Sequence, residues 1–240
     1  KNFNDVVTIA SSDDYTEFLD LLQKHNGTTT ADRKRFAAKA FNISSRYDTN
    51  IFSWFNQEEK TFKKSISEGR ALRYGENPHQ KGFFYGNLDE FFKQLNGKEL
   101  SYNNLLDIDA AVNLIAEFNT PTFAILKHNN ACGLASRKNI TTAFKDALAG
   151  DPISAFGGVL ISNQKIDILT AKEIDQLFCE IIIAPSYEEN ALKLLKSKKN
   201  RIILVQNKIL LEKTQFRTVL NGVLEQDKDL KTDLINEMKT

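Results

Sequence analysis

Short apolar runs separated by amphipathic segments dominate the second half of the chain. The runs are residues 123–126, 159–161, 181–184 and 202–205. Each run is continuous rather than alternating, and continuous apolar strands are typical of a sheet that is covered on both faces. Helices are expected between them, over residues 140–149 and 188–196. This alternation predicts an α/β fold with a three-layer α/β/α architecture.

The N-terminal part of the chain has a different pattern. A short strand is expected at residues 6–10, followed by a helix that Ser11–Asp14 cap and that runs to Leu22. Residues 27–30 break the pattern. Residues 31–64 are helical by composition, which favours a helical connector.

The main domain is expected from Ala71 onward, because Gly and Pro become frequent there and strands alternate with short helices. Residues 207–240 are polar and charge-rich with weak periodicity. The length of 240 residues allows one large domain, or one domain with fragments of others. Because the chain starts at Lys1 and its only methionine is Met238, we expect a piece of a longer protein.

Composition and charge exclude several classes of protein. The chain is 41% hydrophobic and 26% charged, which is close to the average of globular proteins and excludes a disordered or fibrous protein. A net charge of +1 provides no global field for nucleic acid or an anionic membrane, and no apolar run is long enough to span a bilayer. Two cysteines, Cys132 and Cys179, are too few for a disulfide framework, and with three histidines no metal site is predicted. We expect a protein of a reducing compartment that binds neither nucleic acid nor membrane.

Four polar segments border the apolar runs, and in an open α/β sheet the ligand crevice lies beyond the carboxyl ends of the strands. The first segment, residues 72–80, contains Arg73 and Tyr74. An Arg is suited to a bidentate grip on a phosphate or carboxylate, and a Tyr to stacking with one hydrogen bond. The alternative is a rigid surface turn with ordinary polar side chains.

The second segment follows the first apolar run directly. Lys127 and His128 stand at the predicted strand end, where the alternation of sides stops, so a cation and a titratable imidazole can face one crevice. The alternative is a solvated lysine and a structural histidine. Cys132 has no base placed beside it by sequence, which favours a small buried thiol over a nucleophile.

The last two segments are residues 151–158 and 179–186. Gly157 and its neighbouring glycine allow a ligand or another backbone to approach, and Phe156 offers a stacking face. Glu180, at the start of a buried strand, must find hydrogen-bond donors, either at a helix N-terminus or on a ligand. A structural salt bridge is the alternative.

Five segments occur in the order and spacing of one known family. They are LRYGENPHQ at 72–80, SYNNLLDIDAA at 101–111, KHNNACGLA at 127–135, DPISAFGGV at 151–159 and EIIIAPSYEENAL at 180–192. Together they resemble the bifunctional aminoimidazole carboxamide ribonucleotide (AICAR) formyltransferase/IMP cyclohydrolase family of purine biosynthesis. With the opening KNFNDVVTIASSDDY, the resemblance covers nearly the whole chain.

The resemblance implies three parts. Residues 1–30 correspond to a C-terminal remnant of the cyclohydrolase domain and residues 31–70 to the helical linker. Residues 71–240 correspond to the first, cytidine-deaminase-like subdomain of the transformylase domain, whose second subdomain is absent from the chain. The zinc signature of the deaminases is also absent, which fits a relative that uses the fold without metal.

The resemblance also implies an activity, the transfer of a formyl group from formyl-tetrahydrofolate to the 5-amino group of AICAR. His128 would accept the proton of that amine, and Lys127 would stabilise charge on the formyl oxygen or help to shuttle protons. The residues implied in substrate binding are Arg73 and Tyr74 (for the active site of a partner subunit), Asn103 or Asn104, Gly157, and Glu180, where some family members carry Asp. Lys1 matches a lysine of the cyclohydrolase site.

The same resemblance implies a cytoplasmic homodimer with shared active sites and a parent that also cyclises formyl-AICAR to IMP. Two other readings stay open for the 240-residue chain. One is a nucleotide-binding or dimer-forming module without turnover, and the other is a scaffold whose motifs only shape loops.

Overall fold

A computed structural model describes residues 2–56, 58–208 and 210–230. The chain divides into two compact units, residues 1–69 and 70–240. Within the described ranges, no helix is both long and apolar enough to cross a membrane.

The first unit is built on helices, and side-chain caps begin two of them. A short 3₁₀ helix, η1 (Ser12–Asp14), leads into α1 (Tyr15–His25), and α2 follows as Thr30–Phe55. The Ser11 side chain accepts from a backbone N–H of η1, as the capping prediction requires. Residues 6–10, predicted as a strand, have no regular secondary structure. The strand prediction was wrong because an apolar run forms a strand only beside a hydrogen-bonding partner, and none pairs with it in the described part of this unit.

Helix α2 ends earlier than predicted, at Phe55 rather than near residue 64. Its start is fixed by a capping box, in which the Thr29 hydroxyl accepts from the Asp32 N–H and the Asp32 carboxylate accepts from the Thr29 N–H. At its end, the Asn56 side chain bonds both the N–H and the C=O of Glu59. This local bonding offers the backbone an alternative to another helical turn.

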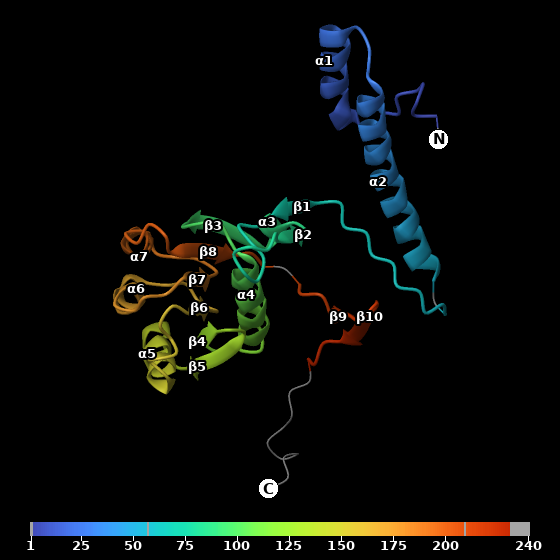
Figure 1. Cartoon of the computed structure of the whole chain (residues 1–240). Coiled ribbons are helices and arrows are strands. Elements are labelled where there is room, and N and C mark those ends of the chain that lie inside the picture. Colours follow the sequence, from blue (N-terminus) through green and yellow to red (C-terminus); the bar gives the residue numbers. More distant parts are fainter. Residues whose placement is uncertain (1, 57, 209, 231–240) are drawn as a thin grey trace. The chain divides into compact units, whose positions relative to one another are not determined.

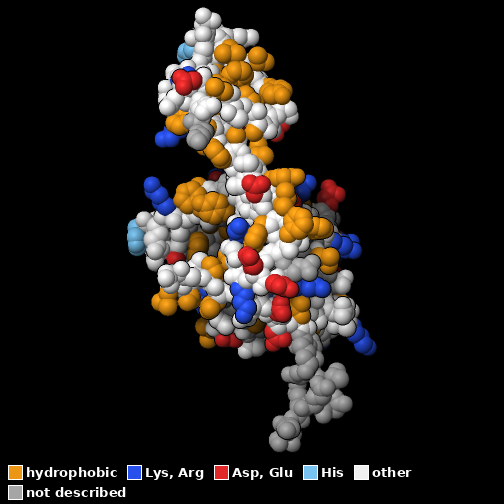
Figure 2. All heavy atoms as spheres, turned by 90° about the vertical axis from the view of Figure 1, so that its right-hand side faces the viewer, with side chains coloured by type: hydrophobic (Ala, Val, Ile, Leu, Met, Phe, Trp, Pro, Cys, Tyr) orange, Lys and Arg blue, Asp and Glu red, His pale blue; other side chains and the backbone are white. Residues whose placement is uncertain are grey.

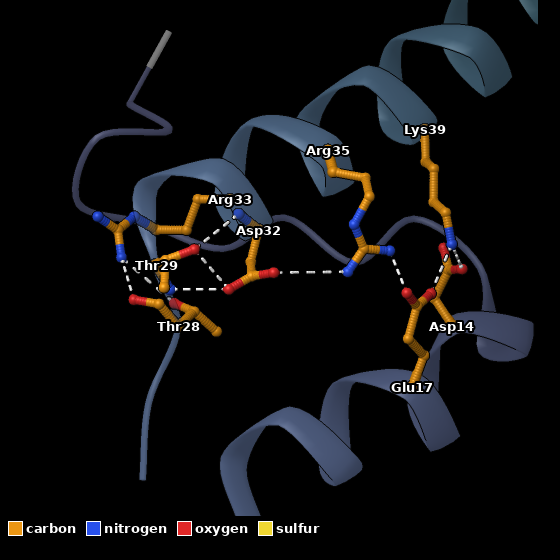
Figure 3. A network of polar contacts seen from close by, with 8 residues as sticks. All are labelled: Asp14, Glu17, Thr28, Thr29, Asp32, Arg33, Arg35 and Lys39. Atoms are coloured by element: carbon orange, nitrogen blue, oxygen red, sulfur yellow. Dashed lines mark hydrogen bonds and ion pairs between the residues drawn. The ribbon is translucent and has the colours of Figure 1, made fainter. Parts of the chain in front are cut away.

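A network of charged side chains joins α1 to α2 (Figure 3). The Lys39 ammonium donates to Asp14 at 2.5 Å and to Glu17 at 2.8 Å, and Arg35 pairs with the same Glu17. These hydrogen bonds hold the pKa of Glu17 below its ordinary value of 4.5 and raise the pKa of Lys39 above 10.5. The pKa of Asp32 is likewise lowered, chiefly by the hydrogen bonds from Thr29.

Much of the apolar surface of this unit is exposed. Phe36 is fully buried and makes an edge-on contact with Phe18, whereas Phe41 and Trp54 of α2 are 65% and 76% exposed. Figure 2 shows hydrophobic side chains gathered over the unit at the top of that view. The helical pattern of α2 therefore buries only part of its apolar positions within this chain.

The second unit is built on a six-stranded mixed sheet of order β3-β8-β7-β6-β4-β5 (Figure 1). The strands from residue 69 onward are β1 (Gly69–Ala71), β2 (Phe83–Tyr85), β3 (Phe92–Asn96), β4 (Thr122–Lys127), β5 (Asn130–Ser136), β6 (Val159–Ser162), β7 (Ile181–Ala184), β8 (Ile202–Gln206), β9 (Thr214–Val219) and β10 (Gly222–Asp227). The helices are α3 (Leu88–Phe91), α4 (Tyr102–Ile115), α5 (Ile140–Gly150), α6 (Ile168–Asp175) and α7 (Glu189–Leu195).

Two cores cover the two faces of this sheet, as the continuous apolar strands predict. Side chains alternate between them, so that Phe123 and Ile125 join one core and Ala124 and Leu126 the other. The first core packs on α5, α6 and α7, and the second on α4 (Figure 1). The predicted α/β fold with a sheet between helical layers is confirmed, and each of the four predicted runs lies within a strand.

Several elements carry no signal in the apolar pattern. Strand β3 pairs antiparallel with β8, and β5 pairs antiparallel with β4. Strands β9 and β10 form a separate antiparallel hairpin in residues where no element was predicted, and nearly all of its side chains are exposed. A hairpin without a buried face leaves little periodicity in the sequence.

Replacing Gly133 should destabilise the second unit, because β5 packs directly on the backbone of α5. A Cβ at Gly133 would lie 1.8 Å from the Ala147 carbonyl oxygen. We expect Gly133→Ala to lower the free energy of unfolding by about 1–3 kcal/mol, measured by urea denaturation. Gly222→Ala is the matched control, since its nearest neighbour would be 3.9 Å away, and it should change stability by less than about 0.5 kcal/mol. Equal effects of the two variants would contradict the packing argument.

The network between α1 and α2 should weaken in acid and in strong base. The pKa values of Glu17 and Asp32 are lowered in the folded state. Their contribution to the stability of the fold is therefore complete above about pH 4.5 and is lost as the pH falls through their folded-state pKa values. The pKa of Lys39 is raised in the folded state, so its contribution to stability is complete below about pH 10.5 and is lost as the pH rises through its folded-state pKa.

A Lys39→Met variant isolates this effect, because it keeps the apolar stem and removes the ammonium. The stability difference between wild type and variant, followed by thermal melts from pH 2.5 to 8, should shrink as the pH drops below about 4.5. A difference that stays constant across this range would rule out the network as its source.

Candidate functional site

The pairing of β4 with β6 decides where the polar segments meet. Because these two strands are antiparallel, the carboxyl end of β4 lies beside the amino ends of β6 and its parallel neighbours β7 and β8. The crevice was expected at the carboxyl ends of the strands. Lys127 lies at the carboxyl end of its strand, whereas Gly157 and Glu180 precede their strands and lie at amino ends.

A tight hairpin presents Lys127 and His128. Lys127 pairs with Asn130, and the two residues between them have positive φ, 53° at His128 and 64° at Asn129. Positive φ at both central positions is the geometry of a type I′ turn. The register shifts between Ile125 and Leu126, and such a bulge increases the local twist and changes where the end of the hairpin points.

The ammonium of Lys127 is held over the loop before β6. It donates to the carbonyl oxygen of Phe156 at 2.8 Å. The next residue, Gly157, has a φ of 76° and donates its N–H to Phe178 at 2.7 Å. A Cβ on Gly158 would lie 2.7 Å from the Leu126 carbonyl oxygen, so the loop lies directly against β4.

Glu180 finds the donors that its position requires. The Asn104 side chain donates to the Glu180 carboxylate at 3.2 Å, and the Lys98 ammonium lies 3.7 Å away. The side-chain oxygen of Asn104 accepts a hydrogen bond from the Ser101 N–H. The side-chain amide therefore caps α4 and bonds Glu180 at the same time. The carboxylate is thus bonded by a side chain in the first turn of α4 and also forms an ion pair with Lys98, which is the structural salt bridge that the sequence left open as the alternative.

The Arg73 and Tyr74 segment joins this end of the sheet through α4. Asn103, adjacent to Asn104, donates to the Glu76 carbonyl oxygen at 3.0 Å. Arg73 stacks over the Tyr74 ring, with 4.6 Å from guanidinium carbon to ring centroid, and donates to its hydroxyl at 2.7 Å. Among the described residues, neither side chain forms a hydrogen bond or ion pair with Lys127 or His128, so this segment contacts α4 but not the end of β4.

A cleft of about 490 Å³ opens beside Glu180. Lys98, Phe178 and residues 198–201 contribute to its lining. Within its wall, Arg201 is almost fully buried and pairs with Asp175 at 2.8 Å. This ion pair anchors the start of β8.

The two thiols are protected from ionisation. Burial raises the pKa of Cys179 to about 11 and raises that of the half-buried Cys132. The Cys132 thiol donates to the Ile125 carbonyl oxygen at 3.4 Å. A thiol with a raised pKa is a poor nucleophile, in keeping with a packing role. In the described ranges, no three His, Cys, Asp or Glu side chains are grouped as a metal site would need.

The structure therefore brings the end of β4, the loop before β6, the start of β7 and the start of α4 to one end of the sheet. The sequence-predicted residues there are Lys127, His128, Asn103, Asn104, Gly157 and Glu180. Lys1 lies outside the described residues.

Three further residues at this end were not singled out from the sequence. They are Lys98 beside Glu180, Asp107, whose carboxylate accepts from the Asn129 N–H at 2.7 Å, and Phe178, whose ring centroid lies 4.9 Å from that of Phe156. Only Asp107 had a usable signal, since it follows Asn103 by four residues on one helix and so lies on the same side. The other two depend on pairings that are distant in the sequence.

Comparison with known proteins gives a single family. Residues 1–240 match the sequence profile described as AICARFT/IMPCHase bienzyme. A protein of Bacteroides thetaiotaomicron named bifunctional purine biosynthesis protein PurH is 56% identical over 242 residues, covering 100% of this chain and 48% of that protein.

Proteins of the same name from other bacteria are also similar. The Chlorobium phaeobacteroides protein is 38% identical, covering 100% of this chain and 49% of the relative, and the Enterococcus faecalis protein is 39% identical, covering 95% and 47%. The chain spans about half the length of the curated relatives that it matches. With a profile match along its whole length, the chain belongs to the AICARFT/IMPCHase bienzyme family.

Proposed function

We propose that this chain supplies the proton-transfer part of an AICAR formyltransferase site. The main support is the hairpin turn after β4. It places the exposed imidazole of His128 next to the ammonium of Lys127, at the end of the sheet where the other polar segments meet. Membership of the bienzyme family supports a nucleotide and a folate as the reactants.

The reaction requires the removal of a proton from a weak nucleophile. As the 5-amino nitrogen of AICAR attacks the formyl carbon of formyl-tetrahydrofolate, His128 takes the proton of that nitrogen, and the carbonyl electron pair moves to oxygen. Collapse of the tetrahedral intermediate breaks the bond from carbon to the folate nitrogen, which receives the proton. The products are formyl-AICAR and tetrahydrofolate. An imidazole suits this proton exchange because the ordinary pKa of a histidine side chain is near neutrality.

Lys127 supplies the positive charge that stabilises the oxyanion. One of its three ammonium protons is used on the Phe156 carbonyl oxygen, which fixes the direction of the side chain. The other protons can face the substrate oxygen. A preoriented cation stabilises developing charge more than a mobile one, because it needs no reorganisation during the reaction.

The surrounding polar groups have the chemistry to bind the substrates. Glu180 can accept hydrogen bonds from hydroxyl groups, the Asn103 amide can hydrogen-bond the nucleotide, and the backbone at Gly157 can be approached closely. The rings of Phe156 and Phe178 are 58% and 55% exposed and offer a stacking surface beside it. We assign Asn104 an indirect role, because its amide is already engaged by Ser101 and Glu180.

The same proposal includes the parts and partners of the whole enzyme. Residues 1–30 would be a remnant of the cyclohydrolase domain that includes Lys1, residues 31–70 the linker, and residues 71–240 a cytidine-deaminase-like subdomain. The parent would be a cytoplasmic homodimer that also closes the ring to IMP. Arg73 and Tyr74, stacked on each other away from Lys127, would serve the active site of the partner subunit.

A second function is favoured for the chain on its own. Because it spans about half of its relatives, it contains only part of such a site, and nucleotide binding without turnover is the expected behaviour. Titration of the 240-residue chain with AICAR tests this, with Glu180→Gln as the variant that should weaken binding.

The proposal is tested in a protein of the relatives' full length that carries this sequence. Formyl transfer to AICAR is followed by absorbance. We expect His128→Ala and Lys127→Ala each to lower kcat by about 10²- to 10⁴-fold, while the Kd for AICAR changes little. The reason is that both side chains act on charge that develops in the transition state.

The matched control is Lys145→Ala, which breaks a surface ion pair between Lys145 on α5 and Glu173 on α6 and should leave kcat unchanged. Full turnover in the His128 variant would show that another group takes the proton. A wild-type protein that binds AICAR but transfers no formyl group would favour the binding module.

A further inference from the structure

The position of His128 depends on the backbone of a two-residue turn. Its imidazole has no hydrogen-bond partner among the described residues, so no side-chain contact of that kind fixes the ring. The turn itself has both central residues at positive φ, and neither is glycine. His and Asn tolerate this region better than most side chains, but type I′ turns favour Asn-Gly at these positions.

One carboxylate binds this turn from outside the hairpin. Asp107, on α4, accepts the backbone N–H of Asn129 at 2.7 Å. An ionised acceptor makes such a bond shorter and stronger than a neutral one. Within the hairpin, the Asn130 side chain donates to the His128 carbonyl oxygen at 2.8 Å. The peptide unit that joins His128 to Asn129 is thereby hydrogen-bonded at both its C=O and its N–H.

Helix α4 is a firm base for this contact. Its start is fixed by the capping box of Ser101 and Asn104, and Ile108, next to Asp107, is buried in the core against the sheet. Asn104 bonds Glu180 three residues before Asp107. Two successive turns of one helix therefore set the spacing between a substrate-binding carboxylate and the turn that carries the imidazole.

We propose that Asp107 is a positioning residue for formyl transfer, which fixes the imidazole of His128 toward the reacting amine by holding the Asn129 N–H. This inference rests on the function proposed above. Asp107 takes no part in the proton transfer. Without it, the turn can adopt other backbone conformations, and each displaces the imidazole from the amine while leaving the other substrate contacts in place.

The test uses two substitutions of Asp107 and one control in the full-length protein. Asp107→Ala removes the acceptor, whereas Asp107→Asn keeps an acceptor oxygen in the same place. We expect Asp107→Ala to lower kcat by about 10- to 100-fold with an unchanged KM for AICAR, as a small misplacement of a catalytic group does. Asp107→Asn should recover most of the lost kcat.

The control is Asp109→Ala, on the same helix. Its carboxylate is exposed and, among the described residues, accepts a hydrogen bond only from Asn113. This variant should retain the wild-type kcat. Hydrogen exchange at the Asn129 amide, measured by NMR on the 240-residue chain, should be faster in Asp107→Ala than in wild type and unchanged in Asp109→Ala.

The outcomes separate this inference from the proposed function. If His128→Ala abolishes turnover but Asp107→Ala behaves like Asp109→Ala, the positioning role is wrong and the function stands. If Asp107→Ala and Asp107→Asn lose kcat equally, or if KM rises in step with the loss, an acceptor for the Asn129 N–H is not what matters and the inference is overturned. If His128→Ala keeps full turnover, the proposed function itself fails.

Discussion

The antiparallel pairing of β4 with β6 is the constraint on which the site depends. In a fully parallel sheet, the carboxyl end of β4 would lie beside the carboxyl ends of its neighbours. The loops before β6 and β7 would then lie at the opposite end of the strands. Here the antiparallel pairing of β4 with β6 brings Lys127 to the loop that contains Phe156 and to the start of the strand that follows Glu180. The chain reverses in the hairpin turn after β4, and β5 returns along the edge of the sheet.

The end of the sheet is then tied together by main-chain groups rather than by side chains alone. Gly158 and Glu180 bond each other through the backbone, Gly157 bonds Phe178, and Lys127 bonds Phe156. Backbone groups at a loop cannot move without breaking bonds on both sides. This suits a site in which several segments, distant along the chain, must keep a fixed spacing.

Local signals in the sequence predicted the elements that local physics fixes. The apolar runs of β4, β6, β7 and β8 and the cap at Ser11 are readable because burial on both faces and capping leave a pattern within a few residues. The strand expected at residues 6–10 was wrong, and the end of α2 was placed too late, because a strand needs a partner and Asn56 competes for the backbone. The candidate residues were found through motifs, but the contacts of Lys98 and Phe178 come from pairings that no local pattern contains.

The main chain at Glu180 is fixed on both sides, since its N–H bonds Gly158 and its C=O accepts from Ile202. A carboxylate at this place therefore cannot adjust its reach by a shift of the backbone. An aspartate at this position would hold its carboxylate one methylene closer to the main chain, a difference of about 1.5 Å. The group that bonds the carboxylate, such as the Asn104 amide, and not the main chain at residue 180, would have to take up that difference.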